Sequence, residues 1–346
     1  MKKNPNERAS AQQQKAKAHR ISKPEAPAPR PWEHLSVDLR KPDPQFPNVS
    51  VRWLLQAILI AFLGAAFCAW ILVCFLFWQG SWQLLFHPSH VLRATPQSLS
   101  IAFQPVRFDA SETGVTQLDG WWIPTDASLP HKTILVLHGA NGNIGDTLPL
   151  DAFLHQQHLN VLAFDYRGYG ESAGRKPSEK QMLQDADYAL SWIAETKFIA
   201  ARNIVVWGTN LGANLAVELA VKHPEIGGVV LDQPLQHPLD AILRDPRSRL
   251  VPARWLLIDR FDLSGSVRAM RTPSLWLVST NAAAPLAYQE DSASKMAVWL
   301  KPPYETDPQA APALKRWLDG LAPSSASQEL PAYAPKRSSV IVPSAR

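Results

Sequence analysis

The segment Asn203–Ala216 reads NIVVWGTNLGANLA and passes from a strand-like to a helix-like pattern within a few residues. The apolar run Ile204–Trp207 is typical of a buried strand, and the residues after the turn favour a helix. Gly208 and Gly212 allow a strand and a helix to approach each other closely. Asn210, at the centre of the turn, is one of the few residue types that tolerate a positive φ. The segment therefore predicts a tight strand–turn–helix connection.

Strand-like and helix-like patterns alternate on both sides of this connection, from about Leu99 to Leu321. Several strand-like runs are apolar throughout, which is typical of a parallel sheet covered by helices on both faces. The sequence therefore predicts an α/β fold with a mostly parallel sheet, interrupted by an irregular Pro- and Arg-rich section at 235–271. Strands are expected at 99–108, 116–125, 133–139, 160–166, 204–207, 227–234, 274–280 and 296–300, and helices at 148–157, 178–196, 211–222, 287–294 and 310–321.

The run Trp53–Trp78 contains no charge and one strongly polar side chain, Gln56. About 20 apolar residues cross the hydrocarbon core of a bilayer, so this run is long enough to span it with some tilt. Trp53, Trp78 and Trp82 lie near its ends, where indole rings favour the interface. A buried core helix would be shorter and amphipathic, and a cleaved signal peptide has an apolar run of about 7–15 residues. The run therefore predicts a transmembrane helix that acts as a signal anchor.

Positive charge is concentrated before this run. Residues 1–52 hold 11 Lys/Arg and 5 Asp/Glu, whereas the rest of the chain holds 24 and 25. Arg40, Lys41 and Arg52 precede the run, and no Lys or Arg follows it until Arg93. The positive-inside rule therefore predicts a cytoplasmic N-terminus and an exported C-terminal domain. In a bacterium, this arrangement places the domain on the periplasmic side of the inner membrane.

The composition predicts four regions along the chain. The first is a disordered, basic cytoplasmic arm at 1–52, which could contact anionic lipid headgroups or serve only as an orientation signal and tether. The transmembrane helix at 53–78 follows, and it contains both cysteines, Cys68 and Cys74. The exported part is therefore expected to have neither a disulfide nor a thiol nucleophile. An α/β-hydrolase-like domain at 86–321 and a disordered Pro/Ser-rich tail at 322–346 complete the chain.

Four short motifs follow one another in the predicted domain. They are LVLHGANGN (Leu135–Asn143), FDYRGYGESAG (Phe164–Gly174), GTNLGA (Gly208–Ala213) and VVLDQPL (Val229–Leu235). In this order and spacing they resemble the α/β-hydrolase superfamily, particularly its membrane-anchored serine hydrolase relatives, the Bem46-like group. The resemblance covers about two thirds of the chain. It implies an α/β-hydrolase fold in which the turn around Asn210 is the nucleophile elbow.

The resemblance also implies a catalytic Ser–acid–His triad, and all three members are missing here. The amide nitrogen of an asparagine is delocalised and does not attack a carbonyl carbon, and no histidine follows His237. Loss of any triad member costs several orders of magnitude in rate. The degenerate positions are Asn210 for the serine, Asn281, Ala282 and Ala283 for the acid, and Tyr304 and Glu305 for the histidine.

Other parts of the resembled site are retained. The family's oxyanion hole is formed by backbone N–H groups beside a helix N-terminus, which could still hold a carbonyl or carboxylate oxygen. The histidine of the His-Gly turn is expected to pack structurally rather than to react. The resemblance implies an oxyanion-hole-like pair at Ala140 and Leu211 and a ligand pocket at His138, Gly139, Asn141 and Asn210.

The remaining polar and aromatic residues are expected to be structural. The C-terminal carboxylates have no nucleophile or base to assist, and the histidines lack metal-ligand spacing. The folded part is nearly neutral, so it has no nucleic-acid footprint. The sequence predicts no metal, no cofactor and no nucleic-acid partner. The structural residues are Asp165, Arg167 and Glu171 as loop contacts; Glu290, Asp291, Glu305 and Asp307 as surface charges; His155, His158, His223 and His237 as non-ligands; and Trp121 and Trp122 as strand packing.

The sequence thus favours a membrane-tethered pseudoenzyme that binds a small-molecule or protein ligand without turnover. Two alternatives stay open. One is an active hydrolase with unusual groups, for example after deamidation of Asn210 to aspartate, although no histidine would then activate water. The other is a scaffold protein of the cell envelope. The section 235–271 forms either a lid over the pocket or a simple cover of the core.

Overall fold

The computed structural model describes residues 50–109, 116–125 and 132–321. The predicted arm, apart from its last residues, and the predicted tail lie outside these described residues. The chain divides into two compact units, Met1–Gly64 and Ala65–Arg346, and the α/β domain belongs to the second. Helix α2 (Val51–Gly80) includes the whole predicted transmembrane run. It is a candidate membrane span, because its most apolar window has a mean hydropathy of 2.7 and no buried residue.

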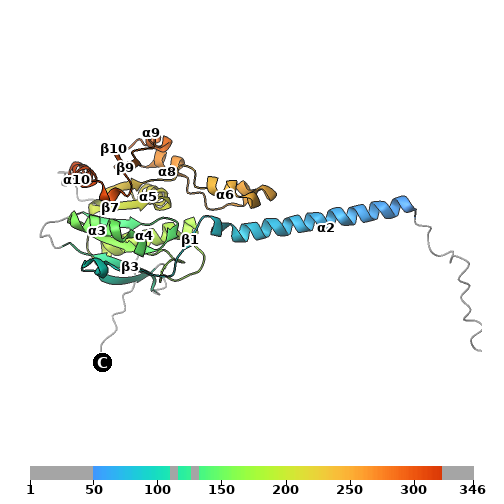
Figure 1. The fold of residues 1–346 in the computed structure, drawn as a ribbon, viewed down its shortest axis with the longest axis horizontal. Coiled ribbons are helices and arrows are strands. Elements are labelled where there is room, and N and C mark those ends of the chain that lie inside the picture. The colour runs from blue at the N-terminus through green and yellow to red at the C-terminus, as the bar shows by residue number, and fades with distance from the viewer. Residues whose placement is uncertain (1–49, 110–115, 126–131, 322–346) are drawn as a thin grey trace, which may run out of the picture. The chain divides into compact units, whose positions relative to one another are not determined.

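An eight-stranded sheet organises the domain (Figure 1), in the order β10-β9-β8-β7-β4-β6-β3-β2. The strands from β10 to β6 are parallel to their neighbours, whereas β3 runs antiparallel to both β6 and β2. The predicted, mostly parallel α/β sheet is therefore confirmed. The strands are β2 (Gln104–Asp109), β3 (Thr116–Ile123), β4 (Thr133–Leu137), β6 (Asn160–Phe164), β7 (Ile204–Thr209), β8 (Gly228–Asp232), β9 (Ser274–Ser279) and β10 (Lys295–Leu300).

Helices cover both faces of this sheet, because its central strands are apolar on both sides. Along β4, Leu135 and Leu137 pack into one core cluster, and Ile134 and Val136 pack into the other. The first cluster includes residues of α4, α5 and α8, and the second includes residues of α3 and α10. These helices are α3 (Leu148–Gln156), α4 (Glu179–Thr196), α5 (Leu211–Lys222), α8 (Leu263–Ala269) and α10 (Ala310–Gly320).

The sequence predicted that the section 235–271 is irregular, and this prediction is wrong for part of it. It contains α6 (Asp240–Arg244), the 3₁₀ turn η6 (Pro246–Leu250), α7 (Ala253–Leu256) and α8. Elements of four to seven residues are too short to show a helical period in the sequence, which explains why they were missed. Leu263 and Val267 of α8 pack into the core, so this last part of the section covers the sheet.

Trp121 and Trp122 both lie in β3 and are buried, which confirms their predicted role in strand packing. The side chains of neighbouring strand residues point to opposite faces of a sheet. Accordingly, Trp122 packs edge to face on Trp192 of α4, with 6.1 Å between ring centroids. Trp121 packs on Phe103 on the other side, at 6.0 Å. The helix expected at 287–294 is shorter, α9 (Leu286–Glu290).

Candidate functional site

The site is built around the turn that joins β7 to α5. Asn210 occupies this turn with φ 52° and ψ −115°, so the predicted positive φ is confirmed. Its backbone N–H donates a hydrogen bond to the carbonyl oxygen of Asp232, at 2.8 Å, at the end of β8. A residue in such a region costs on the order of 1–3 kcal/mol, which asparagine bears better than most. The Asn210 side chain is exposed and has no hydrogen-bond partner among the described residues.

Two glycines make this turn sterically feasible, as predicted. A Cβ atom on Gly208 would overlap the backbone of Gly212 and Ala213. A Cβ atom on Gly212 would overlap the carbonyl groups of Leu137 and His138. The helix therefore starts in direct contact with the strands only because both positions lack a side chain.

A cavity of about 540 Å³ lies over the turn. It is lined by every residue that the sequence assigned to the oxyanion-hole-like pair and the pocket. Leu84, Leu85 and His87, which follow α2, and Leu235 and Pro238, which follow β8, add further walls. The predicted residues that line the cavity are His138, Gly139, Ala140, Asn141, Asn210 and Leu211.

Ala140 and Leu211 both line this cavity. Leu211 is the first residue of α5, so its N–H has no partner inside the helix. Neither N–H group has a hydrogen-bond acceptor among the described residues. A Cβ atom built on Gly139 would lie 3.5 Å from the Asn210 Cβ, which shows how closely the two loops approach each other. Free N–H groups beside the start of a helix attract carbonyl and carboxylate oxygens.

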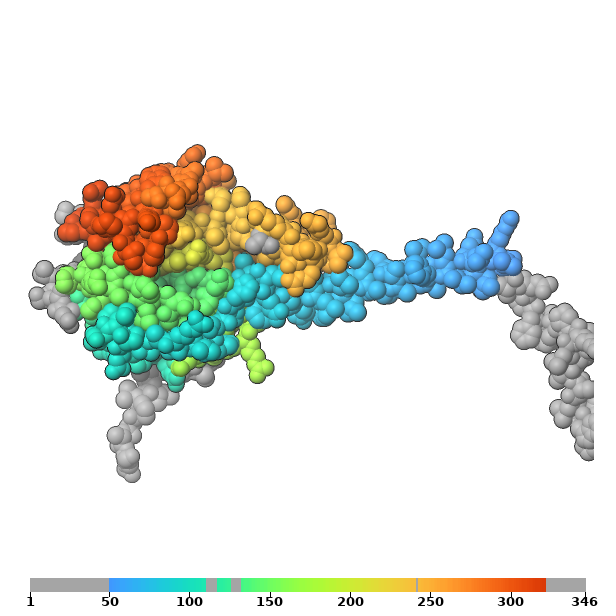
Figure 2. All heavy atoms as spheres, viewed as in Figure 1, coloured from blue at the N-terminus to red at the C-terminus, as the bar shows by residue number. Residues whose placement is uncertain are grey.

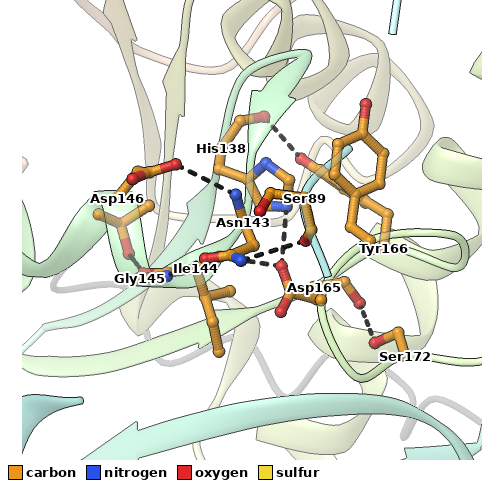
Figure 3. Close-up of polar contacts among 12 residues, drawn as sticks. Ser89, His138, Asn143, Ile144, Gly145, Asp146, Asp165, Tyr166 and Ser172 are labelled. Carbon is orange, nitrogen blue, oxygen red and sulfur yellow. Dashed lines mark hydrogen bonds and ion pairs between the residues drawn. The ribbon is translucent and has the colours of Figure 1, made fainter. Parts of the chain in front are cut away.

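His138 packs structurally, as predicted. Its Nδ1 lies 2.8 Å from the Gly139 carbonyl oxygen, and its ring contacts those of Tyr166 and Tyr169. Its Nε2 lies 3.5 Å from Asp165 Oδ1 (Figure 3). Burial lowers the pKa of this imidazole to about 4, so it is neutral near neutral pH.

The predicted loop contacts of the DYRGYGES motif are present. Asp165 Oδ1 accepts a hydrogen bond from the Ile144 N–H, and the Asp165 carbonyl oxygen accepts one from the Ser172 hydroxyl (Figure 3). Arg167 forms an ion pair with the buried Asp185 of α4. Glu171 lies at the surface, 3.8 Å from an exposed arginine. These contacts hold the loop against the His-Gly turn, which positions one wall of the cavity.

The positions expected for the acid and the histidine lie outside the cavity lining. Asn281, Ala282 and Ala283 form an exposed turn after β9. Tyr304 is buried and Glu305 is partly buried, and both line a second, smaller void beside Asp232. The Tyr304 hydroxyl and Asp232 Oδ1 have no hydrogen-bond partner among the described residues. The void is lined mostly by apolar side chains, and Asp232, Tyr304 and Glu305 bring polar groups to it.

Asp232 and His87 are site residues that the sequence reasoning missed. Burial raises the pKa of Asp232 to about 7, and the nearby charge of Glu305 adds to the shift. Its position at the end of an apolar strand, in VVLDQPL, was a usable signal. His87 reaches the cavity because β1 (His87–Pro88) pairs with β5 (Asn141–Gly142), and its Nδ1 lies 3.0 Å from Asn141 Oδ1. No local pattern indicates that contact.

The prediction of surface charges is wrong for Asp291. Its side chain is only 3% exposed and accepts hydrogen bonds from the Ser274 hydroxyl and the Trp276 indole of β9. The reason is topological: the chain turns back into the sheet directly after α9 and carries this carboxylate inward. Glu290 pairs with Arg268, and Asp307 accepts N–H groups at the start of α10.

No triad geometry is found in the part of the chain that the structure describes. The hydrogen bonds and ion pairs of its histidines lead to carbonyl, amide and carboxylate oxygens rather than to a hydroxyl group. His223, for example, contacts Asp187 and Glu225 at the surface. The same residues contain no group of three side chains that could hold a metal ion. The polar side chains at the cavity include those of His87, Asp146 and Asn210, beside the neutral, buried His138.

A family described as serine aminopeptidase, S33, matches residues 128–294. The chain is 29% identical over 211 residues to an uncharacterized protein of Mycobacterium tuberculosis, Rv2307c, which covers 57% of this chain and 68% of that protein. It is 34% identical over 140 residues to the uncharacterized membrane protein YNL320W of Saccharomyces cerevisiae, covering 40% of this chain and 48% of that protein. Protein bem46 of Schizosaccharomyces pombe is 28% identical over 141 residues, which is 40% of this chain and 46% of bem46. The matches to these two yeast proteins thus span about half of their length.

Solved structures support the fold. An esterase of Pyrococcus furiosus, Pf2001, superposes with a TM-score of 0.54 and 20% sequence identity, covering 68% of this chain and 97% of the esterase. At this level of identity the likeness concerns the fold alone.

Proposed function

This chain belongs to the Bem46-like family of the α/β-hydrolase fold, and we propose that it is a membrane-anchored pseudoenzyme that binds a carbonyl or carboxylate ligand without turning it over. The observation that carries this proposal is the side chain at the elbow. Asn210 keeps the strained turn, but its amide has no nucleophilic electron pair comparable to that of an activated hydroxyl. The absence of an imidazole–hydroxyl pair among the described residues supports the same conclusion.

Ligand binding is supported by the polar groups that remain at the cavity. Ala140 and Leu211, whose N–H groups have no acceptor among the described residues, and Asn210, whose amide is exposed, all line it. Such donors would hold one carbonyl or carboxylate oxygen, as an oxyanion hole does. Leu84, Leu85 and Leu235 supply apolar walls for the rest of the ligand. The proposed ligand is therefore a small acyl compound with one polar end.

The first test is hydrolysis by the full-length chain in detergent micelles. Short p-nitrophenyl esters and a fluorophosphonate probe should give no turnover and no labelling above the Asn210→Ala variant. Asn210→Ser should gain no appreciable activity, because the acid and the base are missing as well. Ester turnover that Asn210→Ala abolishes would overturn the proposal.

The second test is binding of a series of linear carboxylates, followed by thermal shift and calorimetry. Asn210→Asp keeps the shape and the positive φ but adds a negative charge, so carboxylate affinity should fall by about tenfold or more. Asn203→Asp, a change of the same type at a partly exposed position outside the cavity lining, should leave affinity unchanged. Equal affinity in the wild type and both variants would mean that the cavity does not bind these ligands.

His87 makes an active hydrolase the alternative to test alongside. Its imidazole lines the cavity and is held by Asn141, as a base would have to be. If turnover is found, the variant His87→Ala identifies the base: activity lost in both Asn210→Ala and His87→Ala would replace the pseudoenzyme by an unusual hydrolase.

A further inference from the structure

Three large apolar side chains from the end of η6 to the start of α8 are mostly exposed. Leu250 is 65% exposed, Trp255 is 88% exposed and Ile258 is 72% exposed. We refer to these three residues as the apolar patch. Figure 2 shows their segment, in gold, at the surface of the domain. Single exposed apolar residues are ordinary, but three within nine residues indicate a surface with a partner.

Arginines are interleaved with the apolar patch. Arg244 and Arg247 have carboxylate neighbours, at 3.8 Å from Asp240 and 2.8 Å from Asp245. The other three arginines of the segment are exposed and make no ion pair with any residue that the structure describes. A segment that combines tryptophan and aliphatic side chains with unpaired arginines suits a membrane interface, where acyl chains lie beneath anionic headgroups. These three arginines are Arg249, Arg254 and Arg260.

The position of the segment points to the same partner. Within the unit Ala65–Arg346, the Trp70 indole N–H donates a hydrogen bond to the Leu250 carbonyl oxygen, at 3.0 Å. Trp70 belongs to the apolar run of α2 and lies eight residues before its end at Trp78, which corresponds to about 12 Å along the helix. The apolar run is about 39 Å long and exceeds the roughly 30 Å of a hydrocarbon core. With the run centred in the core, about 4–5 Å of it extends beyond the core at each end, so its last turn lies at the interface. Trp70 and the Leu250 carbonyl group that it binds then lie among acyl chains, about 7 Å below that interface.

Lys176 makes a second contact between the domain and α2, nearer the end of the helix. Its ammonium group donates a hydrogen bond to the Gln79 carbonyl oxygen, at 3.2 Å, in the last turn of α2. A lysine at the end of a spanning helix is placed at the headgroup layer. The segment and Lys176 thus contact α2 at two successive depths, the first among acyl chains and the second among headgroups.

We propose that residues 246–260 dock on the membrane surface that α2 enters, with the apolar patch inserted among acyl chains and Arg249, Arg254 and Arg260 bound to anionic headgroups. The consequence concerns the cavity over Asn210. Its walls include Leu84 and Leu85, just after α2, and Pro238, which precedes the segment by eight residues. Docking therefore places one side of the cavity beside the bilayer and gives an acyl ligand a route from the lipid phase.

The test measures the depth of residue 255 in the full-length chain. In a Cys68→Ala/Cys74→Ala background, Trp255→Cys is labelled with an environment-sensitive fluorophore and reconstituted into nanodiscs of phosphatidylcholine and phosphatidylglycerol. We expect a blue-shifted emission that lipids with brominated acyl chains quench strongly. The control is Phe198→Cys, which is 89% exposed and precedes β7, at the amino-terminal edge of the parallel strands. This label should show neither effect.

A charge variant separates insertion from simple proximity. In Arg249→Glu/Arg254→Glu/Arg260→Glu, quenching at position 255 should fall, because each charge near an anionic surface changes the docked-to-undocked ratio about fivefold. Lys315→Glu, a reversal at an exposed site on α10, should not change it.

Three results would overturn the proposal. The first is equal quenching at positions 255 and 198. The second is a blue shift that persists in amphipols without lipid, which would mean that the chain itself covers the patch. The third is a shift that requires two copies in each nanodisc, which would identify a second chain as the partner.

Discussion

At the scale of single residues, the turn at Asn210 combines a strained backbone with an exposed amide side chain. The backbone of this turn requires a positive φ, and Gly208 and Gly212 leave no room for a side chain. Asparagine meets the first requirement at a smaller cost than most residues. Where the resemblance implies a serine hydroxyl, this position carries an amide that can donate and accept hydrogen bonds. The backbone geometry of the turn therefore does not require a hydroxyl side chain at this position.

Asp232 is expected to make stability depend on pH. Burial raises its pKa from the ordinary 3.8 to about 7. Between these values the folded chain keeps a proton that the unfolded chain has lost, so rising pH favours unfolding by about 1.4 kcal/mol per pH unit at most. As the pH rises from about 4 to about 7, the melting temperature should therefore decrease less in Asp232→Asn than in the wild type. Thermal unfolding at several pH values measures this slope.

Other buried carboxyl groups contribute to the same pH dependence, so the Asp232 variant should remove only part of it. Burial also raises the pKa of Asp165 to about 7 and that of Asp151 to about 8. The slope should therefore be reduced in Asp232→Asn but not removed. Asp319→Asn, at an exposed ion pair, is the matched control and should keep the wild-type slope. A wild-type slope in Asp232→Asn as well would show that this carboxyl ionises without penalty.

At the scale of elements, one side chain of α5 holds both ends of the section 235–261. The Asn214 amide donates hydrogen bonds to the carbonyl oxygens of Leu235, at 2.8 Å, and Phe261, at 2.9 Å. Its oxygen accepts a third from the Leu235 N–H, at 3.0 Å. Glu179, the first residue of α4, accepts the N–H groups of Arg260 and Phe261. Hydrogen bonds therefore hold the section 235–261 at both ends, while its middle carries the apolar patch.

Asn214→Leu should loosen this section. The change leaves three backbone groups without partners, of which the Phe261 carbonyl group is fully buried. An unpaired buried group costs about 1–3 kcal/mol, so the free energy of unfolding should fall by at least about that amount. Hydrogen exchange should quicken between residues 235 and 261. Asn203→Leu is the matched control, since the partly exposed Asn203 side chain makes one long contact, at 3.5 Å, with the ammonium group of Lys132. Unchanged exchange in Asn214→Leu would show that α8 alone holds the section.

At the scale of the whole molecule, α2 is the feature that associates the domain with a membrane. Membrane association follows from this candidate span and from the membrane-protein relative, whereas the orientation remains a prediction from charge. A phosphatase that is active only outside the cytoplasm, fused after Arg346, should be active. Replacing Arg40, Lys41 and Arg52 by glutamate should lower the exported fraction. A fluorescent protein at the same C-terminal position that folds and is bright in the cytoplasm would contradict the predicted orientation.

Much of the fold could be predicted from the sequence because it rests on local patterns. The apolar run of α2, the doubly apolar strands and the turn at Asn210 each report the environment of their own residues. The loss of a histidine after His237 is likewise a fact of composition. The candidate pocket residues of the His-Gly turn and the elbow also line one cavity, because both turns end neighbouring parallel strands.

Other features were decided only by tertiary structure. His87 meets Asn141, Trp70 meets Leu250, and Asp291 turns into the core beneath β9. Such contacts join residues that are far apart in the chain, or depend on the direction in which a loop of a few residues returns, and no periodicity records either. The sequence by itself thus determined the frame and the absence of any histidine after His237. Packing decided which polar groups face the cavity and which apolar side chains remain for the membrane, because burial depends on neighbours rather than on residue type.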